Sequence, residues 1–240
     1  MLMTIKHFSA LLPGASCIFV AVNYWPMLNK KVADLRKDYT LAELDESEVA
    51  QDPIQQFEKW WNDALTGEID EANAMTLATS SAAGIPTTRI VLLKSFDKDG
   101  FVFFTNYDSR KGHEMAANPH VSLLFFWKEL QRQVRIDGIV SKVDAAMSTE
   151  YYNSRPIGSR IGAIASPQSS VIPNRSFLEE KVKAVTEKYA ANAPERPENW
   201  GGYIVKPVVI EFWQGRGSRL HDRIQYSQEG SSWKIERLAP

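Results

Sequence analysis

The sequence of 240 residues has one cysteine, almost no excess of charge and few long apolar runs. The single Cys17 excludes an intrachain disulfide and a cysteine-based metal cluster, and a reducing compartment is its natural setting. The 28 basic and 29 acidic side chains leave a formal net charge of -1. That balance argues against a general nucleic-acid coat, which needs many surplus cations for phosphate contacts. The most apolar run, Cys17 to Val22, is too short for a membrane span.

The composition itself is that of an ordinary globular protein, with 44% hydrophobic and 24% charged residues. Residues 1–50 predict a partly disordered N-terminal extension. Its first acidic residue is Asp34, and an acid-free start also occurs in mitochondrial presequences. Those presequences are usually rich in arginine, whereas the first arginine here is Arg36. We therefore expect a cytoplasmic protein, and the mitochondrial alternative stays open.

Residues 51–240 predict one domain that is mainly β with helical additions (α+β). Asp52 and Pro53 are typical of a helix start, and apolar residues recur at helical spacing up to Gly67. Further helices are predicted at 110–118, 145–154, 157–165 and 175–190. Strands are predicted at 75–79, 88–93, 101–105, 121–127, 131–143, 203–213 and 220–226. Because only one short helix interrupts the first five strands, the pattern favours an antiparallel barrel over a doubly wound sheet.

Cations occur at unusual positions in the strand region. Arg89 lies inside an apolar strand and Lys94 follows its end. A half-buried cation needs either a carboxylate, which this strand and its flanks lack before Asp97, or a bound anion. The triplet 109–111, Ser-Arg-Lys, lies at a predicted helix start, where free N–H groups suit a phosphate. A solvated helix start is the alternative interpretation of that triplet.

A third cluster combines Tyr151 and Arg155, whose spacing of four would place them on one face of a helix, with Ser159 as a candidate cap of the next helix. All three side chains can donate to phosphate oxygens. A surface helix with a Tyr–Arg stack is the structural alternative.

A fourth cluster contains Arg219, His221 and Arg223, which would share one face of a strand. The two guanidiniums repel each other unless acidic residues on facing strands or an anionic ligand lie among them. His221 can exchange protons near neutral pH. Amides, hydroxyls and a flat aromatic wall are available from Gln133, Gln168, Ser169, Ser170, Trp213 and Gln214. No Walker loop, GxGxxG or HExxH motif occurs, so the clusters indicate phosphate-bearing aromatic ligands on a barrel.

Several motifs follow one another between about Leu35 and Pro240. They are RIVLLK at 89–94, FTN at 104–106, SRK at 109–111, YYNSRP at 151–156, QSS at 168–170, WGG at 200–202, EFWQG at 211–215, RLHDR at 219–223 and ERLAP at 236–240. Together they resemble the pyridoxine/pyridoxamine 5'-phosphate oxidase family. The resemblance implies a split β-barrel homodimer with FMN at the subunit interface.

The resemblance also implies an activity. The expected reaction oxidises pyridoxamine 5'-phosphate or pyridoxine 5'-phosphate to pyridoxal 5'-phosphate by hydride transfer from C4' to flavin N5. Oxygen then reoxidises the flavin and gives hydrogen peroxide, and the amine substrate also releases ammonia. This reaction is the last step of vitamin B6 salvage. No nucleic acid, membrane or metal partner is expected.

The resemblance transfers roles residue by residue. The FMN contacts would be Arg89, Ile90, Val91, Leu92, Lys94, Phe104, Thr105, Ser109, Arg110, Lys111, Gln133, Gln168, Ser169, Trp213 and Arg223. The substrate contacts would be Lys94, Tyr151, Arg155, Ser159, Arg219 and His221, together with Arg36 and Tyr39 in a site-covering segment at 35–39. Arg219 and His221 are the expected catalytic residues. Phe104 departs from the family pattern, in which tyrosine is common.

Two alternatives belong to other functional classes. A non-catalytic carrier of pyridoxal phosphate would not need Arg89, Arg110, Lys111 and Gln133 together. Another split-barrel protein, such as a flavin reductase-like enzyme, would not need the cluster of Tyr151, Arg155, Ser159, Arg219 and His221.

Overall fold

The computed structural model describes Leu35 and residues 37–240. Arg36 and residues 1–34 lie outside this part of the chain, and so do the predictions made for them. No helix among the described residues is both long and apolar enough to cross a membrane. The cytoplasmic location stays a prediction.

Helix α2 (Pro53–Thr66) begins where its capping signal lies. The Asp52 carboxylate accepts a hydrogen bond of 2.7 Å from the amide of Ile54, and proline occupies the first helical turn. The apolar face of α2 buries Phe57, Trp60 and Ala64. The Phe57 ring packs in the core against the aromatic rings of Phe96, Phe101, Phe125 and Trp127. The aromatic stripe of this helix is therefore core packing.

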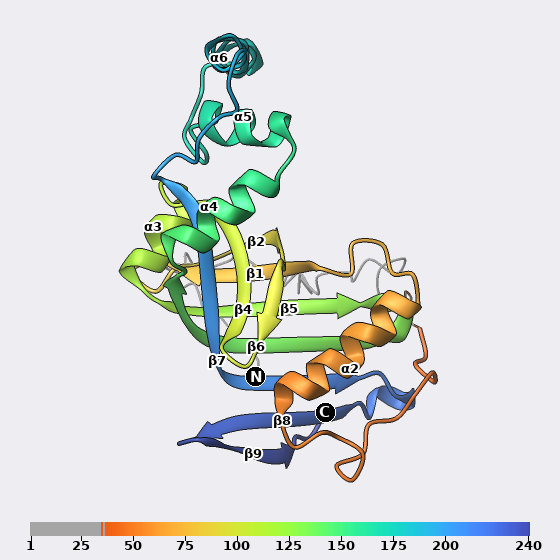
Figure 1. Ribbon diagram of the computed structural model, residues 1–240. Helices are drawn as coiled ribbons and strands as arrows, with labels where there is room; N and C mark the ends of the chain where they lie inside the picture. The colour runs from red at the N-terminus through yellow and green to blue at the C-terminus, as the bar shows by residue number, and fades with distance from the viewer. Residues whose placement is uncertain (1–34, 36) are drawn as a thin grey trace, which may run out of the picture. The chain divides into compact units, whose positions relative to one another are not determined.

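The described strands form one antiparallel sheet (Figure 1). They are β1 (Ala74–Ser80), β2 (Pro86–Leu92), β3 (Ser95–Asp97), β4 (Gly100–Asn106), β5 (His120–Trp127), β6 (Arg132–Lys142), β7 (Trp200–Gln214), β8 (Asp222–Glu229) and β9 (Ser232–Arg237). Their order is β2-β1-β5-β6-β7-β4-β3, with β8 also paired to β7 and β9 paired to β8. The predicted antiparallel arrangement is confirmed.

Strand β7 curls this sheet into a half-barrel because it changes partner along its length. Its first part pairs with β4 and its last part with β8, while β6 runs along both parts. The register with β6 shifts between Asp137 and Gly138. A Cβ atom at Gly138 would lie 2.4 Å from the Lys206 carbonyl oxygen, so this close approach requires glycine.

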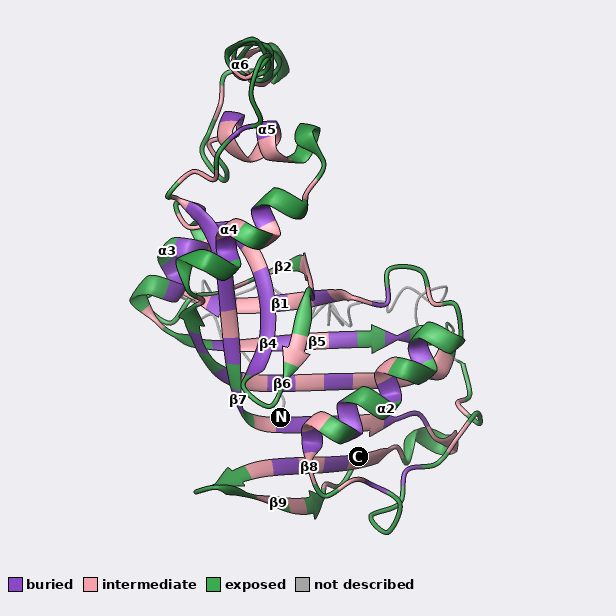
Figure 2. Cartoon of the chain, in the orientation of Figure 1, coloured by how far each residue is buried: buried purple, intermediate pink, exposed green. Residues whose placement is uncertain are grey.

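Four further helices follow: α3 (Arg110–Ala117), α4 (Ala145–Ser154), α5 (Ile157–Ala165) and α6 (Arg175–Lys188). α3 packs against β1 and α4 against β7, whereas α5 and α6 pack against each other (Figure 1). Ser109 and Asn174 cap α3 and α6 as predicted. Figure 2 shows α6 without buried residues, whereas the strands carry the buried core. The prediction of a mainly β protein with helical additions is confirmed.

Two local predictions were wrong, and two strands were missed. Ser159 does not cap α5, because the helix begins at Ile157 and Pro156 occupies the N-cap position. The last predicted strand begins at Asp222 rather than Leu220, since residues 217–219 form a 3-10 turn. Strands β3 and β9 were not predicted.

Candidate functional site

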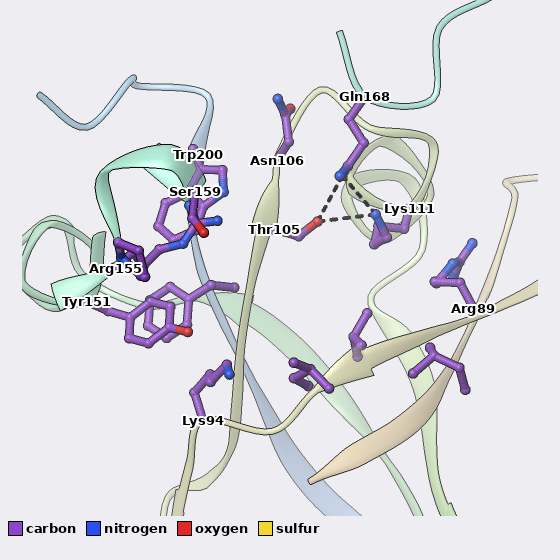
Figure 3. Close-up of a pocket in the computed structure, with 15 residues that line it drawn as sticks. Arg89, Lys94, Thr105, Asn106, Lys111, Tyr151, Arg155, Ser159, Gln168 and Trp200 are labelled. Carbon is purple, nitrogen blue, oxygen red and sulfur yellow. Dashed lines mark hydrogen bonds between the residues drawn. The ribbon is translucent and has the colours of Figure 1, made fainter. Parts of the chain in front are cut away.

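A cavity of about 500 Å³ lies among strand β2, strand β4 and the helices α3, α4 and α5 (Figure 3). It collects most of the predicted site residues, namely Arg89, Ile90, Val91, Leu92, Lys94, Phe104, Thr105, Lys111, Tyr151, Arg155, Ser159 and Gln168. It also contains Asn106, Pro156 and Trp200, to which no role had been assigned, although all three lie in motifs of the resemblance. We call this space the large cavity.

The first end of the large cavity is built around Arg89. Its Nη2 atom lies 3.1 Å from the Glu114 carboxylate of α3 and 2.6 Å from the Thr87 hydroxyl. Its Nη1 atom donates to the Thr79 hydroxyl at 2.5 Å. The partner of Arg89 is thus a carboxylate after all, but it comes from a helix 25 residues further along the chain.

Glu114 is the buried acid of this end, with 7% of its side chain exposed. Burial alone would raise the pKa of its carboxyl group. Hydrogen bonds from Thr79, Thr87, Arg110 and Arg89 outweigh that effect and lower the pKa to about 2. Glu114 is therefore charged throughout the neutral range. The sequence did not indicate this role, because a glutamate inside a short helix cannot be told by its neighbours from a solvent-exposed glutamate.

Lys111 lies beside this group without contacting a carboxylate among the described residues. Its ammonium group donates to Gln168 at 3.0 Å and to Thr105 at 3.2 Å, as Figure 3 shows. It also donates to the hydroxyl of Ser109 at 3.3 Å. Burial and the charge of Arg89 lower the pKa of Lys111. Its charge is thus incompletely offset within the chain, which suits an anionic ligand.

The opposite end of the large cavity contains Tyr151, Arg155, Ser159 and Trp200 (Figure 3). The Arg155 guanidinium lies 4.6 Å from the centre of the Trp200 ring. One of its nitrogens, Nη1, is buried without a hydrogen-bond partner among the described residues. Burial lowers the pKa of Arg155. An orphaned buried donor beside a lysine, a tyrosine and a serine is the environment expected for a phosphate.

A second cavity of about 280 Å³ gathers Gln133, Trp213, His221 and Arg223 from the prediction, together with Arg135, Glu211 and Pro240. It shares no lining residue with the large cavity. Within one chain, the predicted flavin contacts that line a cavity are therefore divided between the large cavity and this second cavity.

The charges of the second cavity are already paired. The Glu211 carboxylate lies 2.7 Å from Arg223 Nε and 2.8 Å from Arg135 Nη2. Glu211 on strand β7 is thus the acidic partner that Arg223 on the neighbouring strand β8 needs. The predicted common strand face of Arg219, His221 and Arg223 is wrong, because Arg219 lies in the 3-10 turn with a φ of 63°.

His221 is held by a backbone contact that sequence reasoning could not anticipate. Its Nδ1 accepts a hydrogen bond of 3.1 Å from the amide of Arg216, so the neutral ring carries its proton on Nε2. Burial and the charge of Arg219 lower its pKa, with a smaller opposing effect from Asp222. The ring packs 4.5 Å from Trp213 and 5.9 Å from Tyr39. The structure therefore places Tyr39, from the predicted covering segment, beside His221.

Five of the predicted residues that the structure describes line neither of these two cavities: Tyr39, Ser109, Arg110, Ser169 and Arg219. Ser109 is fully buried as the cap of α3 and supports Lys111. Arg110 is exposed and pairs with Glu114 at 2.8 Å.

Comparison with known families matches both parts of the chain. Residues 62–189 match the family model described as pyridoxamine 5'-phosphate oxidase. Residues 200–240 match the model described as the pyridoxine 5'-phosphate oxidase C-terminal dimerisation region.

Similar proteins agree with these matches. The chain is 56% identical over 209 residues to a pyridoxine/pyridoxamine 5'-phosphate oxidase of Polynucleobacter asymbioticus, covering 87% of this chain and 99% of that protein. It is also 56% identical over 211 residues to the protein of that name from Cupriavidus pinatubonensis, covering 88% of this chain and 99% of the other.

Among solved structures, PhzG from Burkholderia lata, in complex with tetrahydrophenazine-1-carboxylic acid, superposes with a TM-score of 0.79 at 26% identity, covering 85% of this chain and 100% of PhzG. An FMN-binding protein from Nostoc punctiforme, related to pyridoxamine 5'-phosphate oxidase, shares the fold with a TM-score of 0.62 at 17% identity, covering 80% of this chain and 100% of that chain. The curled antiparallel sheet is thus the split barrel that the chain shares with these structures. On its sequence, its fold and the residues gathered in its large cavity, the chain belongs to the pyridoxine/pyridoxamine 5'-phosphate oxidase family.

Proposed function

We propose that this protein is an FMN-dependent oxidase that converts pyridoxamine 5'-phosphate and pyridoxine 5'-phosphate to pyridoxal 5'-phosphate. The observation that carries the proposal is the set of cations in the large cavity. Arg89, Lys94, Lys111 and Arg155 all line it, and only Arg89 contacts a carboxylate among the described residues. Two separate groups of cations in one cavity suit two phosphate-bearing ligands.

The end of the cavity at Arg89 would hold the phosphate of FMN. Hydrogen-bond donors come from Arg89 on β2, Thr105 on β4 and Lys111 at the start of α3. The guanidinium of Arg110 lies beside them and pairs with Glu114. Gln168 offers an amide to the same ligand. When bound, FMN supplies the redox chemistry, accepting the hydride from C4' of the substrate and passing the electrons to oxygen, which leaves as hydrogen peroxide.

The end at Arg155 would hold the phosphate of the substrate. The buried Nη1 atom of Arg155 would gain its missing acceptor, and Lys94, Tyr151 and Ser159 would complete the contacts. A phosphate fixed at this end would orient the pyridine ring for reaction, which is the main contribution the chain can make to the rate.

The second cavity would complete the site across a homodimer. Its residues belong largely to the region that matches the family's dimerisation region. We propose that Gln133, Trp213 and Arg223 of one copy contact the FMN held by the other, while Arg219 orients the substrate by its charge. His221 would then donate from Nε2, because Nδ1 is occupied by the Arg216 amide. This arrangement favours positioning over proton acceptance for His221.

An anaerobic absorbance spectrum tests the proposal. The purified full-length protein, loaded with FMN, should show an oxidised flavin that bleaches on addition of pyridoxamine 5'-phosphate. Admitting air should restore the colour with formation of hydrogen peroxide. A protein that cannot be loaded with FMN would refute the proposal. Bleaching by a reduced nicotinamide alone would indicate a flavin reductase, and binding of pyridoxal phosphate without bleaching would indicate a carrier.

A further inference from the structure

We propose that Glu114 is a positioning residue for the phosphate of FMN. The proposal rests on the function proposed above and assigns a role to a residue outside all of the family motifs noted in the sequence. Glu114 itself does not line the large cavity, and it acts through the arginines that it holds.

Both carboxylate oxygens of Glu114 are engaged. Oε2 accepts from the hydroxyls of Thr79 and Thr87, each at 2.6 Å, and from Arg89 at 3.1 Å. Oε1 accepts from Arg110 Nε at 2.8 Å. One buried acid thus ties two adjacent strands to two arginines, so the guanidinium of Arg89 has a fixed place before any ligand arrives.

The charge of this group matches the proposed ligand. Arg89, Arg110 and Lys111 carry three positive charges and Glu114 carries one negative charge, which leaves two positive charges beside the cavity. A phosphate monoester carries about 1.5 to 2 negative charges at neutral pH. Glu114 therefore reduces the repulsion among three cations and still leaves enough charge for the phosphate.

Two physical effects of Glu114 have opposite signs, and this makes the proposal testable. As a negative charge near a bound phosphate, Glu114 repels the ligand, so its neutralisation would strengthen binding if charge alone mattered. As the anchor of Arg89, it favours binding, because an arginine held in place loses less conformational entropy when the ligand binds. The proposal requires the second effect to be larger.

The experiment compares FMN with riboflavin, which has the same ring system but no phosphate. Each flavin is titrated into the flavin-free full-length protein, and the quenching of flavin fluorescence gives the Kd. For Glu114→Gln, which keeps the shape of the side chain, we expect the Kd of FMN to rise about tenfold, the equivalent of one charged hydrogen bond at the lower end of its range. The Kd of riboflavin should stay within about twofold, since it does not reach this group.

Two further variants separate positioning from general damage. Met115→Ala removes a buried core side chain from the same helix without touching the cluster, and it should leave the ratio of the two Kd values unchanged. Thr87→Val removes one hydroxyl that joins Glu114 to Arg89, and it should weaken FMN binding in the same direction by a smaller factor. It also serves as the test if Glu114→Gln does not fold.

Three results would overturn the proposal: an unchanged FMN affinity in Glu114→Gln, a tighter one, or an equal loss for riboflavin. Failure of the unaltered protein to bind FMN would instead refute the proposed function, and the positioning role with it. The titration of the unaltered protein therefore separates the two failures.

Discussion

The two ends of the large cavity hold their arginines in different ways. Arg89 is fixed by a buried carboxylate and by two threonine hydroxyls. Arg155 lies on the face of Trp200, and one of its buried nitrogens has no partner among the described residues. The first end is organised by the chain itself, whereas the second is incomplete without an anion.

This difference indicates at which end ligand binding depends more on a single side chain. At the Arg89 end, Lys111 and Arg110 share the charge, and a carboxylate offsets part of it. At the Arg155 end, the described residues include no carboxylate in contact with the guanidinium. An anion that binds there repairs an unfavourable burial as well as forming new hydrogen bonds. Loss of Arg155 should therefore have the larger effect.

The largest expected effect is that of Arg155→Ala. Losing one charge-assisted phosphate contact costs about 1.5–3 kcal/mol, which raises the KM for pyridoxamine 5'-phosphate by roughly tenfold to a hundredfold. The Kd of FMN should stay nearly constant, because its proposed phosphate site lies at the other end. Steady-state kinetics at saturating FMN measure the first value, and flavin fluorescence measures the second.

A matched control for this prediction is Arg175→Ala, which removes an exposed arginine that pairs with Glu179 on α6. It should change neither value. An unchanged KM in Arg155→Ala would show that the substrate phosphate is bound elsewhere.

A smaller effect is expected for Lys111→Met, which should weaken the binding of FMN and leave the binding of the substrate unchanged. Arg89 and Arg110 also contribute positive charge to the proposed phosphate site at this end. The Kd of FMN should therefore rise about tenfold or less, equivalent to at most about 1.5 kcal/mol. The KM for pyridoxamine 5'-phosphate, measured with FMN at saturation, should change little. Equal losses for both ligands would contradict the separation of the two ends.

The same two ends also differ in what the sequence could predict. Arg89, Lys111, Tyr151 and Arg155 lie in short motifs, and local rules place them well, since helix caps and strand alternation are properties of neighbouring residues. The cap by Ser109 is an example. The expected helix face shared by Tyr151 and Arg155 was wrong, because α4 ends at Ser154 and Arg155 follows it in an extended conformation. The expectation that Arg89, Lys111, Tyr151 and Arg155, which come from different segments, share one cavity came from the family resemblance.

What sequence reasoning missed depends on contacts between distant segments. Glu114 reaches Arg89 only because α3 packs beside β1 and β2, and no local pattern records that packing. The strand assigned to Arg219 and His221 failed for a related reason, since Ser218 and Arg219 adopt positive φ angles that end the extended conformation. Proline at the N-cap of α5 likewise displaced Ser159 into the helix.

A further difference between the ends should appear in acid. The pKa of Glu114 is lowered from its ordinary value of 4.5 to about 2 in the folded protein. Its contribution to the free energy of unfolding is therefore complete above about pH 4.5 and is lost as the pH falls towards 2. Urea unfolding across this range should show the difference between the unaltered protein and Glu114→Gln shrinking as the pH falls. Arg155→Ala should show no such trend in this window, and a constant difference for Glu114→Gln would contradict the assignment.

The smallest expected effect concerns Phe104, which the family resemblance assigns to FMN although its ring packs on residues of the Arg155 end. The ring of Phe104 stacks on Tyr151 at 4.0 Å and on Trp200 at 5.7 Å between ring centres, and the residue lines the large cavity. Phe104→Tyr adds one hydroxyl, whose net hydrogen bond contributes about 0.5–1.5 kcal/mol when it finds a partner on the ligand. We expect the Kd of FMN to fall by about two- to tenfold and the KM of the substrate to stay constant. If the KM falls instead while the Kd is unchanged, Phe104 belongs to the substrate end, and the boundary between the two ends lies nearer to Thr105 and Lys111.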